Sequence, residues 1–427
     1  MNSLGSLINF ADRSKMFTTN PEYKSAFEER ITELGYLINN VIVYGRIVST
    51  RNYGNKLSFF DIQDRDNQMQ MMLNKRNLGD HYSELVAMLQ VGNIVRVSGD
   101  FGVSNTGEYT VFVKDSEVLS TSNLPMPDKY HGINDAAIQR SKRYLDLLAN
   151  SNSRERFVLR SNTIQRIRQF LYGRGYIEVE TPVLDTVYGG AEATPFTTHC
   201  EGNGNDLFMR IAPEFYLKQL IVGGMERVFE IGKQFRNEGF DATHHPEFTS
   251  IELYEAYANY KDMARIANKL FLEIGFIHEE MRSMTMIEAI ELYTGWNMSC
   301  NDDAEIMAVF EEQVEPKLIE PTIIFDFPAS YSPLALVCEN NPKFAQRFEI
   351  YANGMEIANA YSEQNNAKEQ RRRIEEQKSE YGVDENFLSA LEYGMPPTGG
   401  MGIGLDRVIM IMTNSTHIQD VILFPLR

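Results

Sequence analysis

Four side chains that lie close together in the chain could bind a nucleotide: Arg236, Glu238, His244 and Phe248. Arg236 and Glu238 are expected on one strand, and a polar loop containing His244 returns into a second strand that begins at Phe248. A guanidinium donates paired hydrogen bonds to phosphate oxygens, and an aromatic face stacks on a base. An ordinary hairpin with a surface ion pair fits the same residues, so this stretch alone leaves both interpretations open.

A glycine-rich stretch near the C-terminus is a second candidate for contact with a nucleotide. It runs from Gly399 to Gly404 and is followed by Arg407, which would open the next helix. Glycines let the backbone pass close to a ligand. The GxGxG spacing differs from the GxGxxG of dinucleotide-binding folds, and no acidic residue follows about 20 positions later in a further strand. A Rossmann fold is therefore not indicated.

Two glutamates, Glu349 and Glu356, flank Asn353-Gly354, which is a hairpin signal. Two carboxylates on paired strands would repel a triphosphate unless cations lay between them. Hard oxygen ligands together with phosphates suit Mg²⁺. The alternative is that both glutamates are ordinary surface acids.

In chain order, the segments Glu178–Pro182, Phe235–Phe248 and Gly399–Arg407 resemble the three motifs of class II aminoacyl-tRNA synthetases. The resemblance is closest to the lysyl-tRNA synthetases, at Arg210–Lys218 and Gly354–Glu363, and it covers the chain from about residue 38 onward. It implies a lysine–tRNA ligase that activates L-lysine with ATP and transfers it to the 3′ end of tRNA(Lys).

The resemblance also implies roles for individual residues around ATP. Arg236 and Arg407 are assigned the catalytic role. Charge builds up on phosphate oxygens during activation of the amino acid, and a fixed guanidinium stabilises that charge. ATP binding is assigned to Arg236, Glu238, His244, Phe248 and Arg407, and Mg²⁺ binding to Glu349 and Glu356.

Lysine binding is assigned by the same resemblance to Gly190, Glu214, Arg236, Glu252, Tyr254, Asn359, Tyr361 and Glu363. Glu252, aided by Tyr254, would pair with the ε-ammonium, since an ammonium taken out of water needs a carboxylate partner. Aspartyl and asparaginyl enzymes are the nearest relatives, and an acid-rich pocket would repel aspartate. Lysine is therefore the expected substrate.

The elements that must position these residues form an α+β protein with more than one domain, as a length of 427 residues suggests. The expected order is an N-terminal helical arm over 1–33, an OB-fold anticodon-binding barrel over 34–122, a linker over 123–150 and a class II catalytic domain over 151–427. In the last of these, an antiparallel sheet is flanked by helices.

The OB-fold is predicted from five strand-like segments at 41–51, 56–64, 68–74, 93–103 and 108–119, with one helical stretch at 78–89. Another small β-domain without a ligand would show the same pattern. By resemblance, Arg51, Phe59 and Gln70 stack on and read a U-rich anticodon. Phe59 and Phe60 are adjacent on one strand, so one faces out and the other joins the core; Phe59 is expected to face out.

The catalytic domain is expected to begin with a long amphipathic helix at about 154–173, which carries Ile164, Ile167 and Leu171 on one stripe. Strands are expected at 177–180, 208–211, 228–235, 248–257, 347–352, 355–362 and 400–405. By resemblance, the long helix and the strand ending at Pro182 form the interface of a homodimer.

The net charge of −18 is concentrated after residue 150, since residues 1–150 carry 16 basic and 17 acidic residues. A nucleic acid responds to the local patch rather than the total charge, so tRNA binding stays compatible with the composition. No apolar run approaches the roughly 20 residues of a membrane helix, and no signal peptide is recognisable. Three unclustered cysteines argue against zinc and for a reducing compartment. A cytoplasmic location without a membrane partner is expected.

Two rival functions remain open at this point. A paralogue could lysylate a protein instead of a tRNA, but such paralogues usually lack the barrel expected here. A catalytically silent tRNA-binding or regulatory protein would be suggested by the loss of Arg236, Arg407, Glu349 or Glu356, and all four are present.

Overall fold

The computed structural model describes residues 37–64, 67–127, 132–187, 189–190, 193–296, 302–376 and 384–426. The chain divides into two compact units, Met1–Asn134 and Asp135–Arg427. The helical arm expected over 1–33 lies outside the described residues. None of the described helices is long and apolar enough to cross a membrane.

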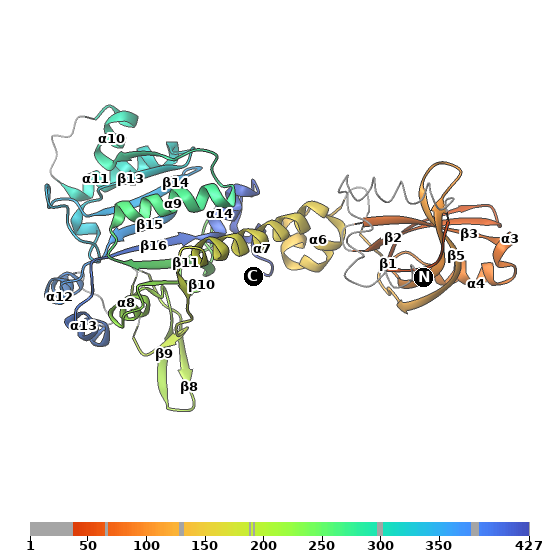
Figure 1. Ribbon diagram of the computed structural model, residues 1–427, viewed down its shortest axis with the longest axis horizontal. Helices are drawn as coiled ribbons and strands as arrows, with labels where there is room; N and C mark the ends of the chain where they lie inside the picture. Colours follow the sequence, from red (N-terminus) through yellow and green to blue (C-terminus); the bar gives the residue numbers. More distant parts are fainter. Residues whose placement is uncertain are drawn as a thin grey trace. The chain divides into compact units, whose positions relative to one another are not determined.

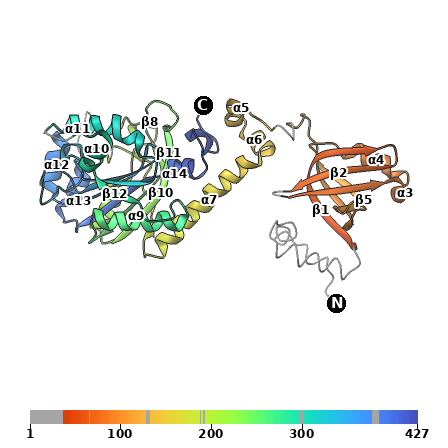
Figure 2. The same ribbon diagram turned by 90° about the horizontal axis from the view of Figure 1, so that it is seen from above.

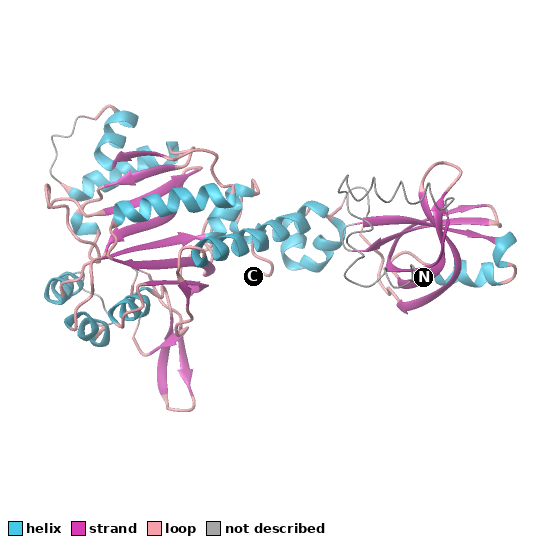
Figure 3. Ribbon diagram, in the orientation of Figure 1, coloured by secondary structure: helices cyan, strands magenta, loops and turns pink. Residues whose placement is uncertain are grey.

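The first unit is a closed barrel of five strands in the order β1-β2-β3-β5-β4 (Figures 1 and 3). Its elements are β1 (Leu37–Tyr53), β2 (Leu57–Asp64), β3 (Asn67–Asn74), α3 (Lys75–Leu78), α4 (His81–Met88), β4 (Ile94–Val103) and β5 (Tyr109–Ser120). All neighbouring strands are antiparallel except β3 and β5. The predicted OB-fold is confirmed.

Closure of the barrel depends on β1, which pairs with both β2 and β4. The register shifts between Ile47 and Ser49 on one side and between Ile38 and Val41 on the other, and such irregularities bend a strand. Alternate side chains then fill the interior, where Phe60 is 2% exposed. Its neighbour Phe59 is half-buried on the other face of β2.

The second unit is built on an eight-stranded sheet in the order β12-β13-β14-β15-β16-β11-β10-β6 (Figure 1). Its strands are β6 (Ile177–Glu178), β10 (Arg227–Phe235), β11 (Glu247–Ala256), β12 (Arg282–Thr285), β13 (Thr322–Phe325), β14 (Arg347–Ala352), β15 (Met355–Ser362) and β16 (Thr398–Gly404). The sheet is antiparallel apart from the pairs β12–β13 and β10–β6 near its two edges.

A separate three-stranded sheet corrects one sequence prediction. The strand expected at 208–211 does not join the large sheet; β9 (Asn205–Met209) instead pairs with β7 (Leu184–Asp185) and β8 (Thr197–Cys200). Figure 1 shows β8 and β9 projecting from the body of this unit as a hairpin.

Helices pack against both faces of the large sheet. The helical segments of this unit are α5 (Ala136–Ser141), α6 (Arg143–Ala149), α7 (Ser151–Tyr172), α8 (Glu214–Val222), α9 (Tyr260–Ile274), α10 (Met286–Thr294), α11 (Asp303–Val309), η2 (Phe310–Val314), η3 (Glu315–Lys317), η4 (Ala329–Tyr331), α12 (Ala367–Glu376), α13 (Glu385–Glu392), α14 (Leu405–Met412) and η5 (Ile418–Asp420). Helices α7 and α9 contact each other and run along one side of the unit (Figures 1 and 2). Side chains of α7, α9 and α14 form one core with Ile251, Ile403 and Ala358 of the sheet, which leaves the opposite face of the central strands open to a ligand.

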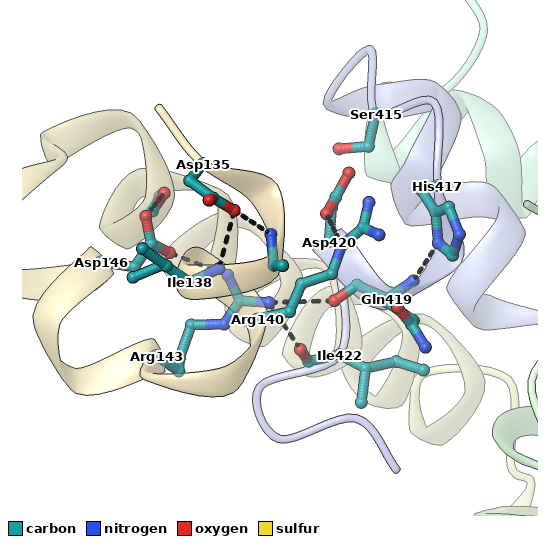
Figure 4. Close-up of polar contacts among 12 residues, drawn as sticks. Asp135, Ile138, Arg140, Arg143, Asp146, Ser415, His417, Gln419, Asp420 and Ile422 are labelled. Carbon is teal, nitrogen blue, oxygen red and sulfur yellow. Dashed lines mark hydrogen bonds and ion pairs between the residues drawn. The ribbon is translucent and has the colours of Figure 1, made fainter. Parts of the chain in front are cut away.

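The second half of the expected linker is folded. Helices α5 and α6 belong to the second unit, and Arg143 of α6 is 1% exposed. Its guanidinium pairs with Asp146 at 2.8 Å and donates to the carbonyl oxygens of Gln419 and Ile422 (Figure 4). It also donates to the carbonyl oxygen of Leu423. These contacts hold the C-terminal segment, whose fixed position matters for the site.

Candidate nucleotide and amino-acid site

The open face of the large sheet forms the floor of a cavity of about 860 Å³. The register pairs Gly402 of β16 with Glu252 of β11 on one side and with Asn359 of β15 on the other. Because Gly402 has no side chain, a trough runs between these two polar residues. Gly400 is closer still to its neighbours: a Cβ there would lie 2.0 Å from an oxygen of Glu363 and 2.5 Å from the ring of Tyr254.

The structure brings nearly all the predicted site residues of this unit to the cavity. Its lining includes Gly190, Glu214, Arg236, Glu238, His244, Phe248, Glu252, Tyr254, Glu349, Glu356, Asn359, Tyr361 and Arg407. The exception is Glu363, which does not line the cavity and is fully buried. Its carboxylate nevertheless lies beside Gly400, which lines the cavity, so Glu363 stays a predicted lysine-binding residue.

Arg236 is the first residue of the loop between β10 and β11. The sequence places Arg236 and Glu238 on a strand, but β10 ends at Phe235 and both residues follow it. The backbone N–H of Arg236 donates to the carbonyl of Pro246 at 2.9 Å, and its guanidinium lies 5.1 Å from the centre of the Phe248 ring. Within the described part of the chain, its buried Nε has no hydrogen-bond partner, so this donor is available to an anion.

Arg407 and His244 meet at the other side of the same loop. The guanidinium of Arg407 donates to the carbonyl of Glu356 at 2.6 Å, and its second terminal nitrogen lies 2.9 Å from Nε2 of His244. Nδ1 of His244 lies 2.7 Å from the carboxylate of Asp241. Burial raises the pKa of Asp241, but hydrogen bonds from Thr243 and His244 outweigh it and lower that pKa to about 2. The ionised Asp241 therefore orients the imidazole.

The C-terminal segment fixes this loop in place. The N–H of Ile418 donates to the carbonyl of Ala242 at 2.7 Å, and the N–H of Leu426 donates to Nε2 of His245 at 3.1 Å. Arg143 holds the same segment from the other side (Figure 4). The side chain of Asp420 is also paired with Arg140 at 2.9 Å. The loop that carries His244 is thus braced by α5 and α6 through the end of the chain.

Glu252 and Glu214 form what we call the acidic end of the cavity. Glu252 accepts a hydrogen bond from the hydroxyl of Tyr254 at 3.1 Å. Burial raises the pKa of Glu252 to about 8, and the nearby carboxylate of Glu214 adds to the rise. Glu214 is 4% exposed, and both its oxygens lie 2.8 Å from the hydroxyl of Tyr361. This end is suited to a cation, because a positive ligand would relieve the cost of burying these charges.

Two basic residues of the site were missed by the sequence analysis. Lys218 of α8 is fully buried and forms ion pairs with Glu214 and Glu363. It lies one helical turn after Glu214, and this i, i+4 spacing is a signal that would have predicted the first pair. Arg347 pairs with Glu349 and donates to Oδ1 of Asn359 at 3.1 Å; no local pattern singles it out.

Glu349 and Glu356 lie on the hairpin of β14 and β15, whose turn residues Asn353 and Gly354 have φ values of 54° and 68°. Arg347 and the Tyr351 hydroxyl hold Glu349. Burial raises the pKa of Glu349 to about 7, against the opposing effect of Arg347. Among the described residues, no group of three or more His, Cys, Asp or Glu side chains is placed to hold a metal. Two carboxylates nevertheless fit Mg²⁺ when phosphates and water complete its coordination.

The barrel gathers its three predicted residues on one wall. Arg51 of β1 lies beside Phe59 of β2 in the register, and the guanidinium of Arg51 donates to Oε1 of Gln70 on β3 at 3.0 Å. Gln70 in turn donates to Oγ1 of Thr110 at 2.9 Å. The ring of Phe59 packs edge-on against Tyr53 at 5.6 Å. This wall offers an aromatic face beside donors and acceptors, as single-stranded nucleic acid requires.

Comparison with known proteins agrees with the division of the chain into a barrel and a second unit built on the large sheet. Residues 135–427 match the family of class II tRNA synthetases (D, K and N), and residues 41–119 match the OB-fold nucleic acid binding domain. A lysine–tRNA ligase of Halalkalibacterium halodurans is 42% identical over 439 residues, covering 92% of this chain and 87% of the relative. One of Streptococcus suis is 39% identical over 97% of this chain and 93% of its own length. Lysine–tRNA ligase 2 of Methanosarcina mazei is 42% identical, with coverage of 89% and 84%.

Proposed function

We propose a reaction for this chain from the premise that it belongs to the class II tRNA synthetases (D, K and N), and within them to the family of its lysine–tRNA ligase relatives. The chain acts as an ATP-dependent lysine–tRNA ligase. It joins L-lysine and ATP into lysyl-adenylate with release of pyrophosphate, and it then transfers the lysyl group to the 3′-terminal ribose of tRNA(Lys).

One observation carries the proposal: the same cavity holds an arginine with an unused buried donor and an end lined by carboxylates. Arg236 supplies the unused Nε, and Glu252 and Glu214 supply the acidic end. An amino acid with a cationic side chain can place its carboxylate toward Arg236 and its ammonium groups toward the glutamates. Attack on the α-phosphorus then develops charge beside a fixed guanidinium, which stabilises it.

The ATP end uses the loop between β10 and β11. Phe248 stacks on the adenine and Glu238 accepts from its amino group, while Arg236 contacts the α-phosphate. His244 and Arg407 contact the γ-phosphate; their contact at 2.9 Å supports a shared position around one anion. Glu349 and Glu356 would hold Mg²⁺, which supplies positive charge that screens the phosphates.

The lysine end uses Glu252 and Tyr254 for the ε-ammonium and Glu214 for the α-ammonium, with Asn359 and Tyr361 beside them. Gly190 has φ of 86°, and its Cα faces Glu214, where a Cβ would lie 3.2 Å from that residue's Cβ. The missing side chain leaves room for the backbone of the amino acid. Glu363 lies beside these residues and is paired with Lys218.

The barrel binds the anticodon through Arg51, Phe59 and Gln70. We also propose that two copies of the chain form a homodimer, because Tyr172, Ile177 and Leu184 expose 54%, 49% and 47% of their surface around the end of α7 and the strands that follow. A cytoplasmic location fits the free thiols of Cys200 and Cys338.

Charging of total tRNA with labelled lysine tests the proposal against both rival functions. The expected result is ATP-dependent, ribonuclease-sensitive incorporation of lysine, with none for aspartate or asparagine. Label that appears on protein instead would favour the protein-lysylating rival. No incorporation together with tight tRNA binding would favour the silent binding protein.

A further inference from the structure

The C-terminal segment, residues 418–426, is held by arginines through its backbone. Each carbonyl oxygen from Gln419 to Leu423 accepts a hydrogen bond from a guanidinium of α6 or α7. Arg143 donates to the carbonyls of Gln419, Ile422 and Leu423, Arg156 to that of Asp420 and Arg160 to that of Val421, at distances between 2.9 and 3.3 Å. Hydrogen bonds from charged donors are stronger than those from neutral ones, so α6 and α7 fix the path of this segment.

Arg143 is the main anchor, because it bonds to three of these carbonyls. It is 1% exposed, and its charge is matched by the fully buried Asp146. Asp146 also accepts from Asn150 at 2.7 Å and from Ser153 at 2.8 Å, so the carboxylate itself is fixed. A planar fork of donors in a set orientation can serve several carbonyls at once, whereas the ammonium of a lysine is a single point on a flexible stem.

The other side of the C-terminal segment contacts residues 236–246 between β10 and β11, which we call the ATP loop. The N–H of Ile418 donates to the carbonyl of Ala242 at 2.7 Å, and the N–H of Leu426 donates to Nε2 of His245 at 3.1 Å. Because Nε2 accepts, the hydrogen of the neutral ring lies on Nδ1, which is 2.7 Å from the carbonyl of Glu247. His245 is 5% exposed, so it joins the segment to the loop inside the protein.

The contact at His245 lies next to residues proposed to hold the γ-phosphate. His244 precedes it in the chain, and Nε2 of His244 lies 2.9 Å from a terminal nitrogen of Arg407. A misplacement of about 1 Å in such groups can cost about 10²-fold in rate. The proposed partners of the lysine ammonium groups, Glu214 and Glu252, lie on α8 and β11. Release of the ATP loop should therefore affect ATP more than lysine.

We propose that Arg143 and His245 are positioning residues for ATP, joined to each other by the C-terminal segment. Arg143 fixes the segment on α6, His245 receives it in the ATP loop, and His244 is thereby held beside Arg407. This inference rests on the proposed function, and it assigns no contact between Arg143 and ATP. It makes α6, which follows the barrel in the chain, a supporting element of the ATP site.

The first test replaces Arg143 with lysine, which keeps a charge beside Asp146 but cannot bond to three carbonyls. In Arg143→Lys, the KM for ATP in lysine-dependent ATP–pyrophosphate exchange should rise about tenfold, while the KM for lysine should change less than about threefold. A role in folding alone would lower the amount of active enzyme without changing either KM. A folded variant with an unchanged KM for ATP would overturn the inference, as would equal rises in both KM values.

A double-mutant cycle tests whether the two residues act through the same segment. His245→Phe keeps a ring but removes the acceptor for the N–H of Leu426, and it should raise the KM for ATP by a similar factor. Because either change alone releases the loop, the KM for ATP of the double variant should lie within about twofold of that of the more affected single variant. Single effects that multiply in the double variant would show independent action and would overturn the inference.

A second variant and a matched control complete the design. If Arg143→Lys does not fold, Leu426→Pro takes its place in the cycle, because proline removes the N–H that His245 accepts and disturbs no buried charge. Arg265→Lys is the control: Arg265 is exposed on α9 and pairs with Asp262 of the same helix, so melting temperature and both KM values should stay as in wild type. If the wild-type chain shows no lysine-dependent exchange, the proposed function fails before Arg143 is tested. The two failures are therefore distinguishable.

Discussion

The two arginines Arg347 and Arg236 differ in whether their side-chain nitrogens have hydrogen-bond partners within the protein. Arg347 donates to Asn359, to the carbonyl of Tyr331 and to Glu349. The buried Nε of Arg236, in contrast, has no partner within the described residues. Leaving a buried donor unpaired costs about 1–3 kcal/mol. A residue that keeps an unused donor beside a cavity is therefore the better candidate for contact with a ligand.

Arg236→Ala should abolish most activity with little effect on stability. Loss of one electrostatic donor typically reduces a rate by about 10²–10³, and no side-chain hydrogen bond to Nε is lost within the folded chain. Pyrophosphate exchange and thermal melting measure the two effects. Arg347→Ala is the contrasting variant and should lower both quantities. Near-normal exchange by folded Arg236→Ala would remove this residue from the catalytic site.

Lysine affinity should increase with pH through the titration of Glu252. Burial raises the pKa of Glu252 to about 8, so below that pH the carboxyl carries a proton that must leave before it can pair with an ammonium. Calorimetric titration of lysine without ATP should show tighter binding as the pH rises from 6.5 to about 8.5.

Glu252→Gln is the control for this pH effect. It should bind lysine more weakly by roughly 2–5 kcal/mol and lose most of the pH dependence over the same range. A wild-type profile that is flat, or that weakens with rising pH, would show that Glu252 is not the partner of the ε-ammonium.

Most of the site was predictable at the residue level because the functional side chains lie within contiguous motifs. The full burial of Glu363 was not, since it depends on α8 packing Lys218 against it. Arg347 was missed for a similar reason: its partners Asn359 and Tyr331 come from other parts of the chain. Motifs indicate which residues gather, whereas tertiary packing decides which of them reach the ligand.

At the scale of elements, β16 shows how a strand without side chains creates a binding surface. It lies between β15 and β11, with glycine at each position that faces the cavity. The strand predicted at 400–405 corresponds to β16, whose observed bounds are Thr398–Gly404. The four-residue strands β12 and β13 were not predicted, because segments this short carry too few residues for a recognisable alternation.

Alanine at two of these glycines should have different effects. A Cβ at Gly400 would lie 2.0 Å from Glu363, which is fully buried, so Gly400→Ala should destabilise the fold by about 1–3 kcal/mol through overpacking. At Gly402 the nearest atom is 3.8 Å away, so Gly402→Ala should keep its stability but reduce exchange about tenfold or more by filling the trough. Denaturant unfolding and exchange assays measure both, and equal stability of the two variants would contradict the packing argument.

The neighbouring phenylalanines of β2 provide a matched pair in the barrel. Phe59→Ala should reduce tRNA charging by about one to two orders of magnitude, since stacking contributes about 1–3 kcal/mol per base, and should leave pyrophosphate exchange unchanged. Phe60 is 2% exposed, so Phe60→Ala should instead cost about 3–5 kcal/mol of stability. Normal charging by a stable Phe59→Ala variant would refute anticodon binding at this wall.

At the scale of the whole molecule, the chain joins two units with separate cores, and each carries one part of the proposed reaction. The barrel wall offers stacking and hydrogen bonding, and the cavity of the second unit offers cationic and acidic ends. Sequence patterns predicted both units. The division falls at Asn134 and not at the end of the expected linker, because the buried Arg143 ties α6 to the C-terminal segment.

The central claim is that the cavity activates lysine. Amino-acid-dependent ATP–pyrophosphate exchange by the full-length protein, measured with each amino acid in turn and without tRNA, tests it most directly. The predicted result is exchange that requires L-lysine and is not supported by aspartate or asparagine, because Glu214 and Glu252 would repel an acidic side chain and leave an amide without a charge partner. Exchange with aspartate or asparagine in preference to lysine, or none with any amino acid, would contradict the account.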